Sequence, residues 1–551
     1  MAQISIIVIA GLIFLFSYSQ GKINNNINQV LAVSITLAFT FVPAILAYLL
    51  GIIATRRLPD EYEIRVKKLY SLEKSFFAFE IIVLIAFVVE LYYLEIPLLI
   101  DQWLSFFHFA SLRRLFTMIP LISGIILIRL SSYELKRRVY GTIRERKEFL
   151  FTQLKFLIFP LIPLLIYFSF LDMAERLPIQ FRIFFIDHAY VSIFIFGILI
   201  VITYIAAPKL LQFLWKSKPL EDFDLSNKIK ALADMHNIKY KSISVWQTGK
   251  ARIANAGVTG LLPRFRRIFV TDVLLENFTT EEIETIIGHE FGHIKYKHLL
   301  IYLAFSLAYF ICYTLFFVYI VPFWEKLFGS NSISEAIVTI IFFIIYFVLI
   351  FRYLSRKFER QADFYAISIT NAPEAFKRAL LKLSYMNYVP QKIKRWMELF
   401  HTHPSIYRRL EFVDNVVAGN KNALKYNHTL LEAKLSLFLL PFLFLLFFIN
   451  VNKIIPPAEV HYEKGRQYLQ EKMVDDAIDE FNKAVAADAN FVDAHYILAL
   501  IYSKEEKWHQ ARRHLLEILK IDKNNKDAKE VLEEIQNYTS KEHKSLGTRR
   551  K

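Results

Sequence analysis

The chain has 551 residues, of which 55% are hydrophobic and 16% are aromatic. This apolar content is too high for a soluble enzyme and indicates several membrane-spanning segments. The formal net charge of +16 is clustered in the loops, so we interpret it as a sign of membrane topology and expect no nucleic-acid partner. The single cysteine, Cys312, excludes an internal disulfide and a cysteine metal cluster.

Nine apolar stretches are candidate membrane spans, the first six within an N-terminal membrane region, residues 1–211. They are Ile4–Tyr18, Val30–Ile53, Phe76–Leu99, Leu115–Ile128, Leu150–Leu171, Ala189–Leu211, Leu299–Val321, Ser334–Phe351 and Leu435–Ile449. Alternate loops are basic: Arg56–Lys74 holds six Lys or Arg residues and Arg129–Lys147 holds seven. Because basic loops stay inside, we expect the N-terminus, Lys209–His298 and Arg352–Lys434 to be cytoplasmic.

The segment after the sixth span predicts a small soluble α+β region. Leu220–Met235 has the pattern of a helix, and Ser242–Gln247 and Arg267–Thr271 have the pattern of short strands. The edge of such a sheet can pair with an extended peptide.

The motif H-E-x-x-H follows this region. Thr279 and Glu282 form a capping box, which predicts a helix start. His289 and His293 are four residues apart and therefore share one helix face. They can both ligate a metal, while Glu290 can reach a water molecule that the metal holds. This is the zincin arrangement, in which Glu290 is the general base, and two imidazoles with an oxygen ligand suit Zn²⁺.

Two histidines can meet this spacing by chance, so the third ligand matters. The metzincin pattern fails because Tyr296 and Leu299 occupy its required positions. His298 falls one residue short of that pattern, and we expect it on the surface or in contact with a ligand.

The gluzincin pattern takes its third ligand from a later helix. Ser355–Ala366 supplies Glu359 and Asp363, one turn apart. We predict one Zn²⁺ per chain with His289, His293 and Glu359 as ligands, while Asp363 accepts the second N–H of a ligand histidine. The alternative is a charged surface helix, which the neighbouring basic residues Arg356, Lys357 and Arg360 favour.

In this combination of motifs, Ile238–Val417 resembles the membrane gluzincins that include the type I CAAX prenyl proteases and the HtpX quality-control proteases. Asn255-Ala256 is similar to the family's N-A element, and two apolar spans separate H-E-x-x-H from Glu359. His403-Pro404, with Arg409 six residues after His403, is similar to the family's late H-P…R element.

The resemblance implies a mainly α, polytopic α-helical membrane protein with a small α+β zincin-type peptidase domain at residues 212–434. Spans 299–321 and 334–351 interrupt that domain, and residues 435–455 form the final span. It further implies that His403 and Arg409 act in catalysis by stabilising the oxyanion. Asn255 and Ala256 are implied to bind substrate.

The composition changes after Pro456-Pro457, where residues 456–538 carry a 34-residue repeat. The matching positions are Gly465, Tyr468, Ala477, Phe481 and Ala484 in the first copy and Ala499, Tyr502, Ala511, Leu515 and Ile518 in the second. This resembles the α-α tetratricopeptide repeat (TPR), with Lys526–Tyr538 as a capping helix; the alternative is a generic helical bundle. The groove of such repeats binds a protein partner. Residues 539–551 are basic and are expected to be disordered.

These observations predict a zinc metalloendopeptidase that cleaves protein or peptide substrates within or at the lipid bilayer, for quality control or processing. We expect it in the inner membrane of a bacterium, with the peptidase site on the cytoplasmic side and the TPR on the other side. Two alternatives remain: a non-catalytic adaptor that acts through its TPR groove, and a CAAX-type prenyl-protein protease.

Overall fold

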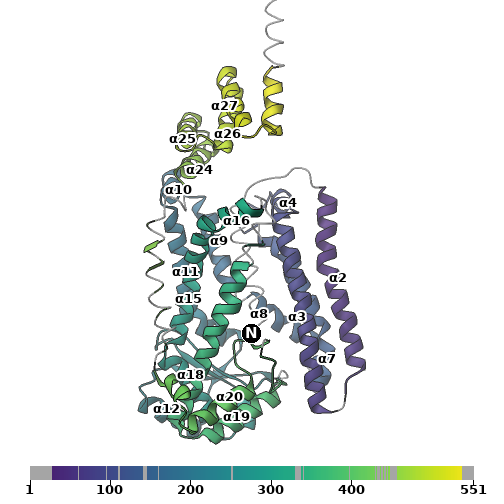
Figure 1. The fold of residues 1–551 in the computed structure, drawn as a ribbon, viewed down its shortest axis with the longest axis vertical. Coiled ribbons are helices and arrows are strands. Elements are labelled where there is room, and N and C mark those ends of the chain that lie inside the picture. Colours follow the sequence, from purple (N-terminus) through teal and green to yellow (C-terminus); the bar gives the residue numbers. More distant parts are fainter. Residues whose placement is uncertain are drawn as a thin grey trace, which may run out of the picture. The chain divides into compact units, whose positions relative to one another are not determined.

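The computed structural model describes a mainly helical chain with one small sheet (Figure 1). It describes residues 28–536 except for 60, 95, 110–111, 114, 141–144, 159–160, 250–251, 329–336, 339–340, 396, 429, 431–434, 436–438, 440–441, 444, 447–448 and 450–455. The chain divides into two compact units, Met1–Asp172 with Gly197–Leu445, and Met173–Phe196 with Leu446–Lys551. The expected span Ile4–Tyr18, most of Leu435–Ile449 and the C-terminal tail lie outside the described residues.

Helices, several of them long and apolar, make up the described N-terminal region. They are α2 (Gln29–Arg56), α3 (Tyr62–Tyr92), α4 (Ile96–Trp103), η1 (Leu115–Met118), α6 (Ile119–Ser131), α7 (Tyr133–Tyr140), α8 (Arg146–Ile158), α9 (Ile162–Ala174) and α11 (Ala189–Leu214). Within the described residues, three helical stretches are long and apolar enough to cross a membrane, or five if each of two bent helix pairs is one span. By length and composition, these helices have the character of membrane spans.

Three expected spans differ from the helices observed. The stretch expected at Phe76–Leu99 belongs to two helices, α3 and α4, which meet at 66°. The stretch expected at Leu150–Leu171 is divided between α8 and α9, and Pro163 lies in the first turn of α9, where a missing N–H costs little. The helical stretch that contains Leu115–Ile128 continues to Val139. Just after Ile128 it carries Arg129, whose Nε lies 2.8 Å from Glu80 Oε1 of α3, and both side chains are buried.

A four-stranded sheet lies beside the H-E-x-x-H helix. Its strands are β1 (Lys218–Pro219), β2 (Ser242–Trp246), β3 (Ala256–Thr259) and β4 (Arg267–Thr271), in the order β1-β2-β4-β3. Strand β2 is parallel to β4, and β3 is antiparallel to β4. The strands expected at 242–247 and 267–271 are thus present. The expected helix at 220–235 is α12 (Phe223–Met235), which begins later because the Asp222 side chain caps it.

The rest of the first unit consists of helices around the site. They are α13 (Asp272–Asn277), α14 (Thr280–Lys295), α15 (His298–Tyr319), α16 (Val321–Phe328), the π-helical segment η4 (Ile344–Phe351), α18 (Arg352–Thr370), α19 (Pro373–Met386), η5 (Met397–Phe400), α20 (Ile406–Val417), α21 (Lys421–Leu424) and η6 (Lys425–Asn427). One face of the sheet, with Val245, Ile268 and Val270, packs into a core with α14 and α12. Helix α18 packs against α14, which brings two distant parts of the chain together.

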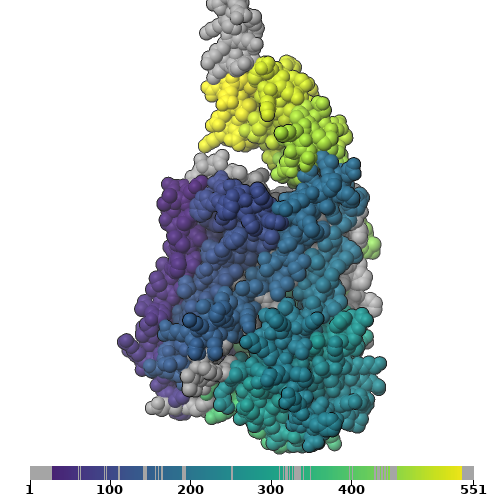
Figure 2. All heavy atoms as spheres, turned by 180° about the vertical axis from the view of Figure 1, so that it is seen from behind, coloured from purple at the N-terminus to yellow at the C-terminus, as the bar shows by residue number. Residues whose placement is uncertain are grey.

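The second unit contains two helical hairpins. They are formed by α24 (Pro457–Gln470) with α25 (Val474–Ala487) and by α26 (Val492–Lys504) with α27 (Trp508–Ile521), and a further helix covers 526–536. Among the matched repeat positions, Ala477, Phe481, Ala499 and Leu515 are fully buried. Figure 2 draws the first hairpin in yellow-green and the second in yellow.

Candidate zinc centre and active site

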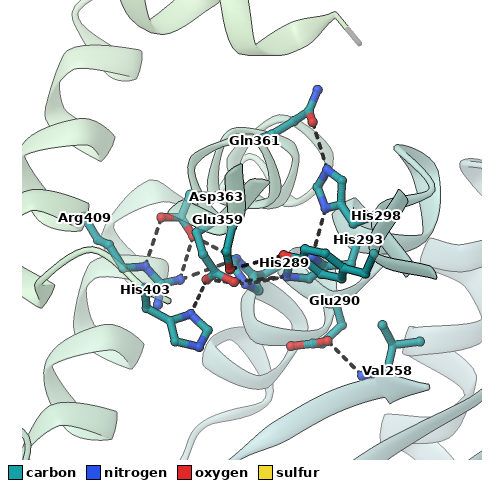
Figure 3. Close-up of polar contacts among 12 residues, drawn as sticks. Val258, His289, Glu290, His293, His298, Glu359, Gln361, Asp363, His403 and Arg409 are labelled. Atoms are coloured by element: carbon teal, nitrogen blue, oxygen red, sulfur yellow. Dashed lines mark hydrogen bonds and ion pairs between the residues drawn. The ribbon is translucent and has the colours of Figure 1, made fainter. Parts of the chain in front are cut away.

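Helix α14 presents its two motif histidines on one face (Figure 3). The Thr279 side chain accepts a hydrogen bond from the Glu282 N–H, and the Glu282 carboxylate accepts one from the Thr279 N–H, so the expected capping box is present. Because His289 and His293 are one turn apart, their Nε2 atoms lie 3.2 Å from each other. The local sequence therefore produces the first half of the metal site.

Helix α18 supplies the third candidate ligand. Glu359 Oε2 lies 3.4 Å from His289 Nε2, and Glu359 Oε1 lies 3.6 Å from His293 Nε2. Zinc–ligand bonds of 2.0–2.1 Å in a tetrahedron place ligand atoms about 3.4 Å apart. The three side chains form a candidate metal group in which all the ligand atoms lie within 4.8 Å of one another. Their type and spacing fit Zn²⁺.

Asp363 contacts His289 on the side of the ring that faces away from the metal position, and Arg409 binds Asp363. His289 Nδ1 lies 2.8 Å from Asp363 Oδ1, and Arg409 donates to both oxygens of Asp363, from Nη2 at 2.6 Å and from Nε at 3.0 Å. Burial disfavours the charged carboxylate, but Arg409 and His289 outweigh burial and hold the pKa of Asp363 below its usual value. Because a carboxylate only accepts, His289 Nδ1 must carry the proton, and its Nε2 lone pair points to the metal position.

His298 holds the outer side of His293. The Nδ1 atoms of His293 and His298 are 2.9 Å apart, and His298 Nε2 lies 2.9 Å from Gln361 Oε1. Gln361 in turn donates from Nε2 to the His428 carbonyl at 2.7 Å. Because that carbonyl can only accept, Gln361 Nε2 is the donor, and Gln361 Oε1 accepts from the N–H at His298 Nε2. His298 Nδ1 then carries no proton and accepts a hydrogen bond from the N–H at His293 Nδ1.

The Nε2 lone pairs of His289 and His293 therefore face each other at 3.2 Å. Such an arrangement is repulsive unless a cation lies between the two nitrogens, which supports the metal site.

The sequence left two alternative positions for His298, and it did not predict a role for Gln361. His298 is fully buried and stacks on Phe358 at 4.1 Å, so the expectation of a surface position is wrong and the expectation of a ligand contact is right. A signal for His298 was available: a histidine starting an apolar helix needs a polar partner. Gln361 had no such signal, because its role depends on the packing of α18 against α14.

Glu290 lies at the edge of the sheet. Its Oε2 accepts a hydrogen bond from the Val258 N–H at 2.9 Å. Strand β3, which carries Val258, is the last strand of the described sheet. Ala256 is half-buried on the same strand, and Asn255, just before it, is exposed. The structure thus places Asn255 and Ala256 along the edge that leads to Glu290.

His403 reaches the centre from the loop before α20. Its Nδ1 lies 2.7 Å from Glu359 Oε2, and 43% of its side chain is exposed. The loop is anchored by Arg356 Nη1, which donates to the carbonyls of Glu398 at 3.0 Å and His401 at 3.0 Å. Burial opposes ionisation of Glu359, but His403 and His289 outweigh burial and hold its pKa well below the usual value.

Residues 219–417 match the model of the family described as Peptidase family M48. CAAX prenyl protease 1 of Saccharomyces cerevisiae is 28% identical over 282 residues, covering 47% of this chain and 61% of that protein. A Protease HtpX homolog of Moorella thermoacetica is 26% identical over 221 residues, covering 35% of this chain and 72% of that protein. An uncharacterized metalloprotease, YhfN of Bacillus subtilis, is 28% identical over 208 residues, covering 36% and 49%.

Among solved structures, S. mikatae Ste24p aligns with a TM-score of 0.45 at 18% identity, covering 71% of this chain and 100% of that chain. In the sequence comparison, the chain spans about 61% of the length of the Saccharomyces relative. The family match covers every candidate site residue discussed above, from Asn255 to Arg409. Residues 219–417 of this chain thus match the model of Peptidase family M48 and contain the candidate metal group His289, His293 and Glu359.

Proposed function

We propose that the chain is a zinc-dependent endopeptidase that hydrolyses peptide bonds of membrane or membrane-associated proteins. One observation carries this proposal: His289, His293 and Glu359 each offer a ligand atom, and these three atoms lie within 4.8 Å of one another. The two Nε2 atoms lie 3.4 and 3.6 Å from one or the other Glu359 oxygen, and Glu290 is on the same helix as the two histidines. Three protein ligands leave one position open, which is typical of catalytic zinc sites.

The protein groups divide the reaction between them. Zinc, when bound, polarises the scissile carbonyl and lowers the pKa of water. Glu290 takes a proton from the attacking water and passes it to the leaving amine. Its hydrogen bond from the Val258 N–H fixes the carboxylate at the sheet edge, where a peptide paired with β3 presents its backbone. Asn255 and Ala256 are proposed to contact that peptide.

His403 and Arg409 differ in how they could stabilise the oxyanion. His403 is partly exposed beside Glu359, so its ring can turn toward a substrate oxygen. Arg409 already makes two bonds to Asp363. We therefore assign oxyanion stabilisation to His403 and propose that Arg409 supports catalysis by holding Asp363 and, through it, His289.

The names of the relatives suggest two substrate classes. One relative is named a CAAX prenyl protease and another a Protease HtpX homolog. We favour quality control or processing of membrane proteins in a bacterial inner membrane, with a prenylated-protein substrate as the alternative. A non-catalytic adaptor is less well supported, because His289, Glu290, His293 and Glu359 are all present and converge.

We also propose that the helical hairpins are TPR repeats that recruit a protein partner on the side of the membrane opposite the peptidase site. Support comes from contacts within the second unit. Arg182 of α10 (Ile179–Asp187) donates to Gln467 Oε1 at 2.8 Å, and Lys464 lies 3.0 Å from Asp187. The positive-inside count puts the loop that contains α10 outside, so the hairpins that pack on it belong there too.

The experiment that tests the function compares two forms of the full-length purified chain. Wild type and Glu290→Gln are each loaded with zinc in detergent and incubated with an unfolded protein, and new peptide termini are identified by mass spectrometry. Wild type should produce internal cleavages that the variant does not. Absence of wild-type cleavage in this assay and in membranes from cells that express the chain would reject the peptidase function.

A further inference from the structure

An aromatic pocket lies beside the edge strand that leads to Glu290. Trp215 and Trp246 stack with their ring centres 4.3 Å apart, and Trp215 meets Phe269 edge-on at 5.2 Å. These rings, together with Leu211 and residues 255–259, line a cavity of about 140 Å³. We call this cavity the β3 pocket.

The register of the sheet determines which face of β3 the pocket occupies. Gly257 pairs with Phe269, whereas Val258 pairs with Ile268, which is buried in the core on the α14 side. Because side chains alternate between faces, Gly257 and Phe269 belong to the opposite face. Gly257 leaves that face open: a Cβ built on it meets no atom within 4 Å.

The backbone of β3 determines how a peptide would approach this pocket. The Asn255 carbonyl accepts a hydrogen bond from Thr271 of the neighbouring strand segment, and Val258 directs its N–H to Glu290 instead. In an antiparallel strand, alternate residues turn their main-chain groups toward the partner strand and away from it. The N–H and C=O of Ala256 and the C=O of Val258 therefore face the free edge of the sheet, beside the Val258 N–H that binds Glu290.

We propose that the β3 pocket is a specificity subsite that binds one apolar side chain, aliphatic or aromatic, of the peptide substrate. This inference rests on the proposed peptidase function. A peptide paired with β3 alternates its side chains between the two faces of the sheet, and a side chain on the Phe269 face enters the pocket. None of the pocket's lining residues is charged, so a charged side chain would lose hydration without a partner.

Two substitutions change the size of the β3 pocket without touching the zinc ligands. Gly257→Val fills it from the strand, and Trp246→Ala enlarges it. Trp103→Ala in α4, a tryptophan that is 52% exposed, is the matched control. The full-length zinc-loaded variants are incubated with a library of peptides, and cleavage sites are mapped by mass spectrometry.

Wild type and Trp103→Ala should prefer an apolar residue at one fixed position relative to the cleaved bond. Gly257→Val should lower kcat/KM roughly tenfold for a peptide with leucine at that position, and should lower it much less for a matched alanine peptide. Trp246→Ala should relax the preference. An apolar preference that is absent in wild type, or unchanged in both pocket variants, would overturn the subsite.

A binding measurement separates failure of the subsite from failure of the function. Glu290→Gln chains, with and without Gly257→Val, are titrated with capped alanine hexapeptides in which leucine replaces one residue at a time. At least one leucine position should improve binding, and Gly257→Val should abolish that gain. If wild type cleaves nothing yet this selectivity is seen, only the peptidase function fails; equal binding of all peptides rejects the subsite.

Discussion

Gly292 of α14 and Ala362 of α18 are in direct contact across the two helices that carry the zinc site. A Cβ on Gly292 would stand 2.7 Å from the Cα of Ala362, closer than carbon atoms can approach. Only glycine therefore permits this helix spacing. Ala362 lies three residues after Glu359, so the contact also sets how far the glutamate stands from the two histidines.

Replacing this glycine is the first test of the helix contact. Gly292→Ala should push α18 away from α14 and lower the free energy of unfolding by about 1–3 kcal/mol, the usual cost of overpacking. Zinc affinity, measured by competition with a chelator, should fall as well. Gly257→Ala, where a Cβ meets open space, is the control and should change neither quantity. Unchanged zinc affinity in Gly292→Ala would show that the helix spacing does not position Glu359.

Removal of the third ligand should release the metal. Wild type is expected to carry about one zinc per chain, measured by elemental analysis of the purified protein. Glu359→Ala should lose most of that zinc, because two imidazoles alone bind it weakly. Glu374→Ala, at a glutamate whose side chain is 70% exposed, should retain it. Full zinc content in Glu359→Ala would contradict the assignment of Glu359 as a zinc ligand.

The roles of Glu290 and of the ligands can be separated. Glu290→Gln preserves the size of the side chain and an acceptor for the Val258 N–H, but it cannot take a proton. Peptidase activity should fall by at least ~10²-fold, whereas zinc content should equal that of wild type. Turnover comparable to wild type would exclude Glu290 as the base, and loss of zinc would show that it acts as a ligand.

His298 provides a test of the support behind His293. His298→Phe keeps the stacking on Phe358 but removes the acceptor for the His293 N–H, so the His293 ring loses its fixed orientation. Zinc affinity should fall roughly 10–100-fold, as for other partners of metal-bound histidines. Gln361→Leu should act in the same direction. His509→Phe, at an exposed histidine, controls for the substitution itself, and equal zinc affinities in all four proteins would refute the role.

The membrane side of the helical hairpins can be measured with cysteines. In a Cys312→Ser background, Lys523→Cys reports on the hairpins and Lys421→Cys reports on the peptidase domain. An impermeant maleimide added to intact cells, with the outer membrane permeabilised, should label the first and not the second. If both are labelled only after the inner membrane is opened, the hairpins lie on the same side as the peptidase site.

Local sequence patterns determined much of the candidate site. The capping box at Thr279 and the spacing of His289 and His293 depend on one helix only, so the observed start of α14 and the shared face of the two histidines follow from the sequence. The strands at 242–246 and 267–271 were likewise readable from their composition. The expectation of a zinc metallopeptidase agrees with the match of residues 219–417 to Peptidase family M48 and with the candidate metal group.

Tertiary packing determined the contacts between site residues that lie far apart in the sequence. Glu359 is 66 residues beyond His293, and the packing of α18 against α14, with its close contact at Gly292, brings it within 3.6 Å of that histidine. The same packing buries His298 and gives Gln361 its partner, and strand pairing places Phe269 opposite Gly257 beside two tryptophans. The sequence by itself determined the residue types and the helix faces, because these depend on neighbours along the chain. The distances between helices, the proton positions on the histidines and the β3 pocket depend on contacts between distant segments, which only the folded structure supplies.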